Sequence, residues 1–198
     1  MAAATAPRGP GAVACTPVTR APEPARWTIH DERLIDDTRR LHVAIAHVEL
    51  PDGVQFEQYV LRMPKASMTV VLNDARDHVL MIYRHRFIMD RWTWELPGGY
   101  VDPDEDPALT AAREIEEETG FKPRSIRLLT TFQPLAGTAD FENLIYVAEG
   151  AEDTGTAPDI NEAAKVKWIP LANVRTMIAN SEIIGAGAQL GLMFVLTG

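Results

Sequence analysis

The sequence predicts a protein of the α/β class. Short apolar stretches that alternate with polar residues, or run on until a turn signal, indicate strands on both sides of residue 106. Residues 107–119 instead repeat their apolar positions at helical spacing, and further helical patterns lie near the C-terminus. The length of 198 residues suits one domain with a sizeable core and a small appendage.

The composition argues against nucleic acid as a partner. The chain has a formal net charge of −9, whereas binding to a phosphate backbone requires a basic surface. A small phosphorylated substrate remains possible, because it responds to local charges and to a metal ion. With 46% hydrophobic and 24% charged residues, the chain has the composition of an ordinary soluble globular protein.

The sequence also predicts a cytoplasmic location and no membrane anchor. No apolar run reaches the roughly 18–20 residues that span a bilayer, and the N-terminus lacks the hydrophobic core of a signal peptide. The single cysteine, Cys15, rules out an intramolecular disulfide and agrees with a reducing compartment. We interpret Cys15 as an incidental free thiol, because it lies in the leading segment.

Three segments divide the chain. Residues 1–25 are rich in Ala, Pro and Thr without periodicity, and we expect them to form a disordered leader. Residues 26–63 are expected to form strands, including a hairpin that turns at Gly53. Residues 64–198 contain all the remaining elements.

The largest segment is expected to mix strands and helices. Its predicted strands are 67–73, 79–86, 125–132, 143–148 and 166–169. Its predicted helices are 107–119, 171–180 and a buried terminal helix within 183–196. Turn-forming and acidic residues indicate two loops, at 133–142 and 150–161.

The first predicted helix has both a start signal and a stop signal. Asp106 is a good N-cap residue, and Pro107 then occupies the first helical position, where a missing N–H costs nothing. Gly120 suits the left-handed conformation that ends many helices. The apolar residues expected to face a core are Ala108, Ala111, Ala112 and Ile115.

Three glutamates share a neighbouring face of this helix. Glu114, Glu117 and Glu118 are spaced three and four residues apart, and each like-charged pair costs a helix roughly 0.2–0.5 kcal/mol. A divalent cation would reverse the sign of that cost, and carboxylate oxygens suit Mg²⁺ or Mn²⁺. For the three glutamates taken alone, a solvated acidic surface is the commoner explanation.

The surrounding residues favour the metal site. From Gly99 to Phe121 the chain reads GYVDPDEDPALTAAREIEEETGF, which fits G-x5-E-x7-R-E-U-x-E-E-x-G-U, with U apolar, at every specified position. A chance match of the fixed positions at a given start is on the order of one in a billion. This pattern is the Nudix box, and the chain resembles the Nudix hydrolases.

Within that superfamily the chain most resembles the ADP-ribose pyrophosphatases, from about residue 40 onward. The resemblance rests on a hairpin with a DG turn, the strand LMIYRHRF, the approach WELPGG and a proline in the loop after the box. It implies an α/β/α sandwich with a mixed sheet and an N-terminal antiparallel strand region at 26–63. That region would help to build a homodimer whose substrate pocket takes residues from both subunits.

The resemblance implies a set of metal ligands. Gly98 would offer its carbonyl, and Glu114 and Glu118 would be the principal carboxylate ligands of Mg²⁺. Glu117 would bridge metals or orient water. Glu105 would support the site from the start of the helix.

The resemblance also implies which arginines act. Arg113 would pair with a box carboxylate and hold it in orientation, and Arg86 matches the phosphate-contacting arginine of the family. Arg84 is a second candidate phosphate clamp, because its guanidinium is planar and offers several donors. The family has Gln-Tyr where this chain has Arg84-His85.

A carboxylate in a loop before the last strands is implied as a further catalytic residue. The candidates are Asp159 and Glu162. We favour Glu162, because it directly precedes the return of the chain at residues 163–167.

The implied reaction is Mg²⁺-dependent hydrolysis of the pyrophosphate bond in a nucleoside diphosphate linked to a second moiety. ADP-ribose would give AMP and ribose 5-phosphate, with Glu117, Glu162 and Arg113 in catalysis. Alternative substrates are another nucleotide sugar, a dinucleoside polyphosphate, NADH or an oxidised nucleoside triphosphate. A Nudix protein that only binds a nucleotide is a second alternative, which the complete set of box carboxylates disfavours.

Overall fold

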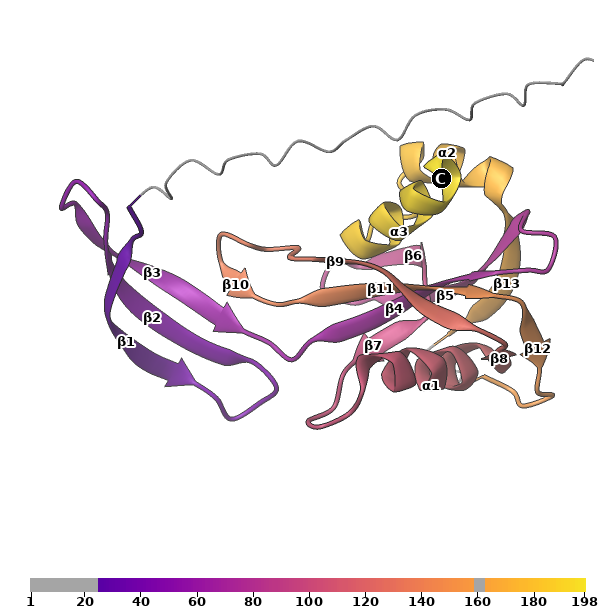
Figure 1. Cartoon of the computed structure of the whole chain (residues 1–198), viewed down its shortest axis with the longest axis horizontal. Coiled ribbons are helices and arrows are strands. Elements are labelled where there is room, and N and C mark those ends of the chain that lie inside the picture. The colour runs from indigo at the N-terminus through magenta and orange to yellow at the C-terminus, as the bar shows by residue number, and fades with distance from the viewer. Residues whose placement is uncertain (1–24, 159–162) are drawn as a thin grey trace, which may run out of the picture.

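The computed structural model describes residues 25–158 and 163–198, and its strands fall into two main sheets (Figure 1). The first sheet contains the N-terminal strands and takes its last strand from far along the chain. In spatial order it consists of β1 (Thr28–Asp36), β2 (His42–Glu49), β3 (Gln55–Arg62) and β10 (Ala139–Asp140). Of the predicted leader, only residue 25 lies within the described residues.

The second sheet has seven strands and forms the core of the molecule. Its main path, in spatial order, is β13 (Lys165–Pro170), β5 (His78–Arg86), β4 (Ala66–Leu72), β11 (Asn143–Glu149) and β9 (Ile126–Phe132). Two short strands pair with β5 and β4 respectively, namely β6 (Arg91–Glu95) and β7 (Gly98–Tyr100). A separate two-stranded sheet consists of β8 (Phe121–Pro123) and β12 (Ala151–Asp153).

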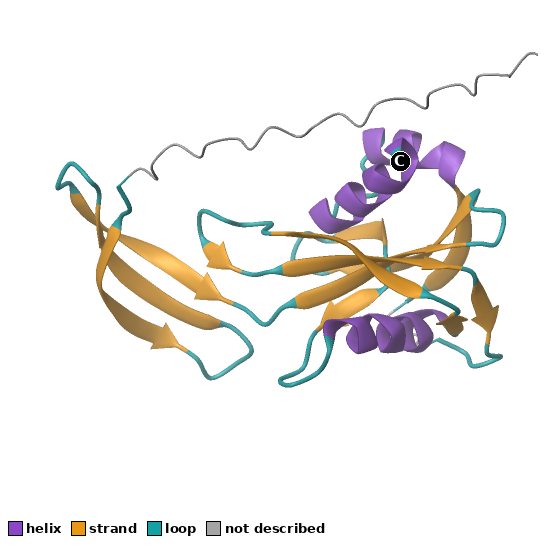
Figure 2. Ribbon diagram, viewed as in Figure 1, coloured by secondary structure: helices purple, strands orange, loops and turns teal. Residues whose placement is uncertain are grey.

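Helices cover both faces of the core sheet (Figure 2). One face carries α1 (Pro107–Thr119), and the other carries α2 (Leu171–Ala179) and α3 (Ala186–Thr197). β11 runs parallel to β4 and antiparallel to β9, so the sheet is mixed. These observations confirm the predicted α/β fold class. Among the described helices, none is long and apolar enough to cross a membrane.

The central strands β4 and β5 are apolar on both faces, because each face is covered by helices. Residues 70–72 and 79–82 are fully inaccessible to solvent. On the α1 side, Ile115 packs with Val71 and Leu80. On the opposite side, Val70 and Leu192 belong to the larger core cluster, together with residues of α2. The continuous apolar runs of the sequence therefore mark the centre of the sheet.

The structure contains strands where the sequence predicted only loops. Residues 91–100, expected as an approach to the helix, form β6 and β7, and the loop 133–142 contains β10. Each of these strands is two to five residues long, too short for its own residues to show a clear periodicity. β7 and β10 pair with strands far along the chain, whereas β6 pairs with the preceding strand β5. The terminal helix begins at Ala186 rather than at residue 183, and Ile183 is fully buried ahead of it.

The helix α1 begins and ends as its sequence predicted. The Asp106 side chain accepts a hydrogen bond from the Ala108 N–H at 2.8 Å, and Pro107 is the first helical residue. Gly120 ends the helix with φ +74°, and its N–H donates to the Glu116 carbonyl at 2.9 Å. Both ends of the helix are therefore fixed by local contacts.

We expect Asp106→Ala to lower the free energy of unfolding by about 1 kcal/mol, because the Ala108 N–H loses its acceptor. Asp106→Asn restores a capping oxygen and should recover most of this loss. Urea denaturation of the three proteins measures the difference. Equal stability of the wild type and the alanine variant would show that the cap contributes nothing.

Candidate active site

A cavity of about 900 Å³ lies between α1, the core sheet and the start of α3. Its lining combines charged side chains of both signs with apolar residues and glycines. The carboxylates are Glu95, Asp102, Glu114, Glu117 and Glu118. The arginines are Arg40, Arg84, Arg86, Arg91 and Arg113. Such a cavity can bind an anionic group at its arginines and a cation at its carboxylates.

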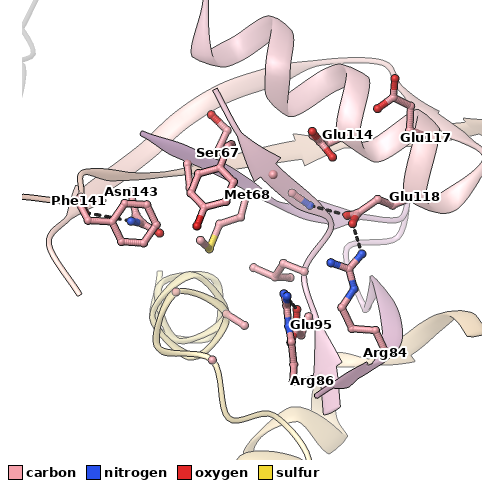
Figure 3. A pocket seen from close by; sticks show the side chains of 18 of the residues that line it. Ser67, Met68, Arg84, Arg86, Glu95, Glu114, Glu117, Glu118, Phe141 and Asn143 are labelled. Carbon is pink, nitrogen blue, oxygen red and sulfur yellow. Dashed lines mark hydrogen bonds and ion pairs between the residues drawn. The ribbon is translucent and has the colours of Figure 1, made fainter. Parts of the chain in front are cut away.

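Glu118 is the most deeply buried carboxylate of the cavity, with a side chain 2% exposed. One oxygen accepts the Gly98 N–H at 2.7 Å, and the other contacts the Arg84 guanidinium (Figure 3). Burial raises the pKa of Glu118 to about 7, although Arg84 and the Gly98 N–H favour its charged form. A buried carboxylate with a shifted pKa in a cavity is typical of functional sites.

Arg113 holds the outer carboxylates of the same helix. Its guanidinium contacts Glu105 at 3.3 Å, Glu114 at 3.0 Å and Glu117 at 2.8 Å. The hydrogen bond from Arg113 lowers the pKa of Glu105, and the same bond raises the pKa of Arg113. Thr110 also donates to Glu105 at 2.7 Å. One arginine thus offsets the repulsion among carboxylates that the sequence places on one helical face.

Arg86 is paired with Glu95, a residue that the sequence analysis did not single out. The Arg86 Nε lies 2.8 Å from one Glu95 oxygen, and a terminal nitrogen lies 2.5 Å from the other. This two-point contact raises the pKa of Arg86 and fixes the plane of its guanidinium. Glu95 belongs to the WELPGG stretch, so this motif could have identified Glu95 as a candidate site residue.

Two glycines let the backbone approach this site closely. A Cβ on Gly98 would collide with the Ser67 carbonyl and with Met68. A Cβ on Gly99 would collide with the Glu114 carboxylate. Both positions therefore require glycine for space, and the approach brings the Gly98 N–H to Glu118.

The opposite side of the cavity carries aromatic residues. The rings of Tyr100 and Phe141 lie 6.0 Å apart, and the Arg40 guanidinium lies 4.8 Å from the centre of the Tyr100 ring. Asn143 donates to the Phe141 carbonyl at 3.1 Å. Figure 3 shows Phe141 and Asn143 across the cavity from Glu118. The sequence analysis did not identify this side, because its residues come from segments far apart in the chain.

The structure brings most of the predicted site residues to this one cavity. The predicted residues that line it are Gly98, Glu114, Glu117, Glu118, Arg84, Arg86 and Arg113. Glu105 reaches the same cluster through Arg113. Glu162 and Asp159 lie outside the described residues.

The donor set suits a hard divalent cation. Glu114, Glu117 and Glu118 offer carboxylate oxygens and Gly98 offers a backbone carbonyl, the ligand types that Mg²⁺ and Mn²⁺ prefer. As they stand, no three acidic, histidine or cysteine side chains within residues 25–158 and 163–198 are grouped so as to hold an ion. Arg113 and Arg84 contact these carboxylates instead.

Comparisons with known proteins agree with this geometry. The family model of the NUDIX domain matches residues 63–184. A CMP-5'-(N-acetyl-N-hydroxy-3-aminopropyl)phosphonate hydrolase of Streptomyces rubellomurinus is 46% identical over 171 residues, 86% of this chain and 82% of that protein. An ADP-ribose pyrophosphatase of Mycobacterium tuberculosis is 30% identical over 132 residues, 65% of this chain and 64% of that protein.

A solved structure of an ADP compounds hydrolase has the same fold, with a TM-score of 0.77 and 21% identity. The superposition covers 89% of this chain and 95% of that one. The chain therefore belongs to the Nudix family. It is a Nudix hydrolase whose relatives include an ADP-ribose pyrophosphatase, in agreement with the resemblance seen in the sequence.

Gly99→Ala and Gly98→Ala should have different consequences. The added methyl group at residue 99 meets a carboxylate that can move, so we expect the protein to fold but to bind Mn²⁺ at least about tenfold more weakly. At residue 98 the methyl group meets backbone, so we expect a loss of stability of about 2 kcal/mol or more. Thermal unfolding and Mn²⁺ titration separate the two effects. Tight Mn²⁺ binding by Gly99→Ala would contradict the assignment of Glu114.

The stability of the metal-free protein should fall as the pH rises. Folding raises the Glu118 pKa from its ordinary 4.5 to about 7, so between these values the folded state binds a proton that the unfolded chain releases. Folding is therefore disfavoured progressively as the pH rises through this interval. Above pH 7, the burial of charged Glu118 lowers the free energy of unfolding by about 3 kcal/mol relative to its value at acidic pH. Urea unfolding in EDTA from pH 5 to pH 8 measures it.

The matched control is Glu118→Gln, which cannot titrate. Relative to this variant, the wild type should lose stability from pH 5 to about pH 7 and little more from there to pH 8. A difference between the two proteins that stays constant from pH 5 to pH 8 would show that Glu118 does not titrate there.

Proposed function

We propose that this protein hydrolyses the pyrophosphate bond of a nucleoside diphosphate linked to a second moiety, in a reaction that depends on Mg²⁺. The first candidate substrate is ADP-ribose, which would give AMP and ribose 5-phosphate. The observation that carries the proposal is the cavity in which the carboxylates of α1 lie beside Arg84 and Arg86. A diphosphate bound with a cation has the charge pattern that this cavity complements.

Each charged residue has a proposed role. Glu114, Glu117, Glu118 and the Gly98 carbonyl would hold Mg²⁺, with Mn²⁺ as a substitute. When bound, the cation would neutralise charge on the phosphates and lower the pKa of a bound water. Arg113 keeps Glu114 and Glu117 in place through its contacts at 3.0 and 2.8 Å.

Two further residues would act directly on the substrate. Arg86, oriented by Glu95, would hold the phosphate that is not attacked. Glu162 would orient the attacking water and accept its proton as the new oxygen–phosphorus bond forms. The bond between the attacked phosphorus and the bridging oxygen then breaks, and the bridging oxygen leaves with the other phosphate.

A homodimer built through residues 26–63 is part of the proposal, with residues 64–198 as the Nudix hydrolase domain. The N-terminal sheet leaves large apolar side chains exposed, which is typical of an interface. Among the described residues of this region, they include Trp27, Ile29, Leu34, Ile35 and Tyr59.

The relative with 46% identity favours a second candidate substrate, a phosphonate linked to CMP. This compound presents the same kind of target, because a nucleoside monophosphate is joined through an anhydride to a second phosphorus acid. The same carboxylates and arginines would serve it. The two candidates differ in the nucleobase and in the leaving group.

A substrate panel tests the proposal. The purified protein with MgCl₂ is assayed against ADP-ribose, other nucleotide sugars, a CMP-linked phosphonate, NADH and nucleoside triphosphates, with the products identified by mass spectrometry. We expect the highest kcat/KM on a nucleoside monophosphate joined to a second phosphorus acid. Strong preference for a triphosphate would overturn this choice. Hydrolysis in ¹⁸O water identifies the phosphorus that is attacked.

We expect Glu117→Gln and Glu118→Gln each to lower kcat by about 100-fold or more, because each removes a charged oxygen ligand. Glu116→Gln is the matched control, since Glu116 belongs to the same helix but is exposed and does not line the cavity. Initial rates on the best substrate of the panel, with circular dichroism to verify folding, decide the result. Wild-type turnover by both cavity variants would refute the mechanism.

A further inference from the structure

The contact between Arg84 and Glu118 connects a candidate phosphate-binding residue with a proposed metal ligand. Glu118 is a proposed metal ligand, yet both of its oxygens are already occupied, one by the Gly98 N–H at 2.7 Å and the other by Arg84. Glu118 is buried, with a side chain 2% exposed, and Arg84 is partly buried, with a side chain 16% exposed. A cation that bound Glu118 would therefore meet a guanidinium at the same carboxylate.

Arg84 and Arg86 occupy alternate positions on β5, so their side chains leave the same face of the sheet. Arg86 is held by Glu95, which is not among the proposed metal ligands. Arg84 is held by Glu118, which is. Of these two arginines, Arg84 is thus the one whose partner would change when a cation binds.

We propose that Arg84 is a positioning residue that exchanges partners. Its guanidinium neutralises Glu118 while no cation is bound, and it moves to a phosphate of the substrate when Glu118 becomes a metal ligand. This inference rests on the proposed function. It predicts that the cation alone binds weakly, and that the anionic substrate favours cation binding by giving Arg84 a new partner.

A contribution to folding stability does not by itself explain the ion pair between Arg84 and Glu118. Removing two charges from water costs several kcal/mol per ion in general, and a buried pair of this kind is weak evidence of stabilisation. An exchange of partners explains why an arginine stands here. The Arg84 guanidinium neutralises the Glu118 carboxylate until a cation takes its place. A cation and the Arg84 guanidinium would compete strongly for the Glu118 carboxylate, because charges at contact distance interact more strongly inside a protein than in water.

Mn²⁺ binding without nucleotide tests the inference by isothermal titration calorimetry. Arg84→Gln removes the charge and retains an amide donor, and we expect it to bind Mn²⁺ at least about tenfold more tightly than the wild type. Arg84→Lys keeps the charge and should stay within about threefold of the wild type. Arg91→Gln is the control for loss of charge in the same cavity, since Arg91 donates to the Ser181 carbonyl at 3.1 Å.

Arg84→Gln should also raise KM for the nucleotide substrate by about tenfold, because a phosphate contact is lost. Tighter Mn²⁺ binding with weaker substrate binding is a combination that a merely structural role would not give. Unchanged or weaker Mn²⁺ binding by a folded Arg84→Gln protein would overturn the inference, as would an equal gain in Arg84→Lys or Arg91→Gln. If Arg84→Gln fails to fold, Arg84→Met carries the same expectation.

The outcomes separate this inference from the proposed function. If the wild type hydrolyses ADP-ribose or the CMP-linked phosphonate but Arg84→Gln leaves Mn²⁺ affinity unchanged, the inference fails and the function stands. If no substrate of the panel is hydrolysed but Arg84→Gln gains Mn²⁺ affinity, the function fails and the competition at Glu118 stands.

Discussion

The burial of Glu118 is the constraint on which the rest of the site depends. Inside the protein, the Gly98 N–H contacts one oxygen of this carboxylate and the Arg84 guanidinium contacts the other. The first contact requires the backbone of β7 to come close to β4, where only glycine fits. The second requires a cation on the neighbouring strand β5. The helix, the two strands and the glycine therefore form one interdependent unit.

Opposite charges in this cavity are organised in two layers. Near the solvent, Arg113 joins Glu105, Glu114 and Glu117, and its long side chain can adapt as the carboxylates change partners. Deeper in the cavity, Arg84 meets Glu118 in a setting from which water is largely excluded. The outer layer offsets repulsion along a helix face, whereas the inner layer neutralises one buried carboxylate.

The fold positions this site at the junction of the two main sheets. β10 pairs with β3 through Ala139 and Leu61, so the segment that leads to Phe141 is held against the N-terminal sheet. Arg40 reaches Tyr100 from the connection between β1 and β2. The aromatic side of the cavity is therefore assembled from both sheets and β7, while the charged side belongs to α1 and the core sheet.

Reasoning from the amino-acid sequence predicted the helix α1, its caps at Asp106 and Gly120, the central strands and the residues of the box. These features depend on the capping preferences of single residues and on the periodicity of apolar residues, and both can be seen within one short segment of the chain. The folded chain was needed to show that Arg84 meets Glu118, that Glu95 orients Arg86, and that β6, β7 and β10 form strands. The contact of Arg84 and the strands β7 and β10 depend on partners distant in the chain, which leave no periodic pattern in either segment. β6 and the Arg86–Glu95 pair belong to one hairpin, but β6 is too short to show a pattern of its own.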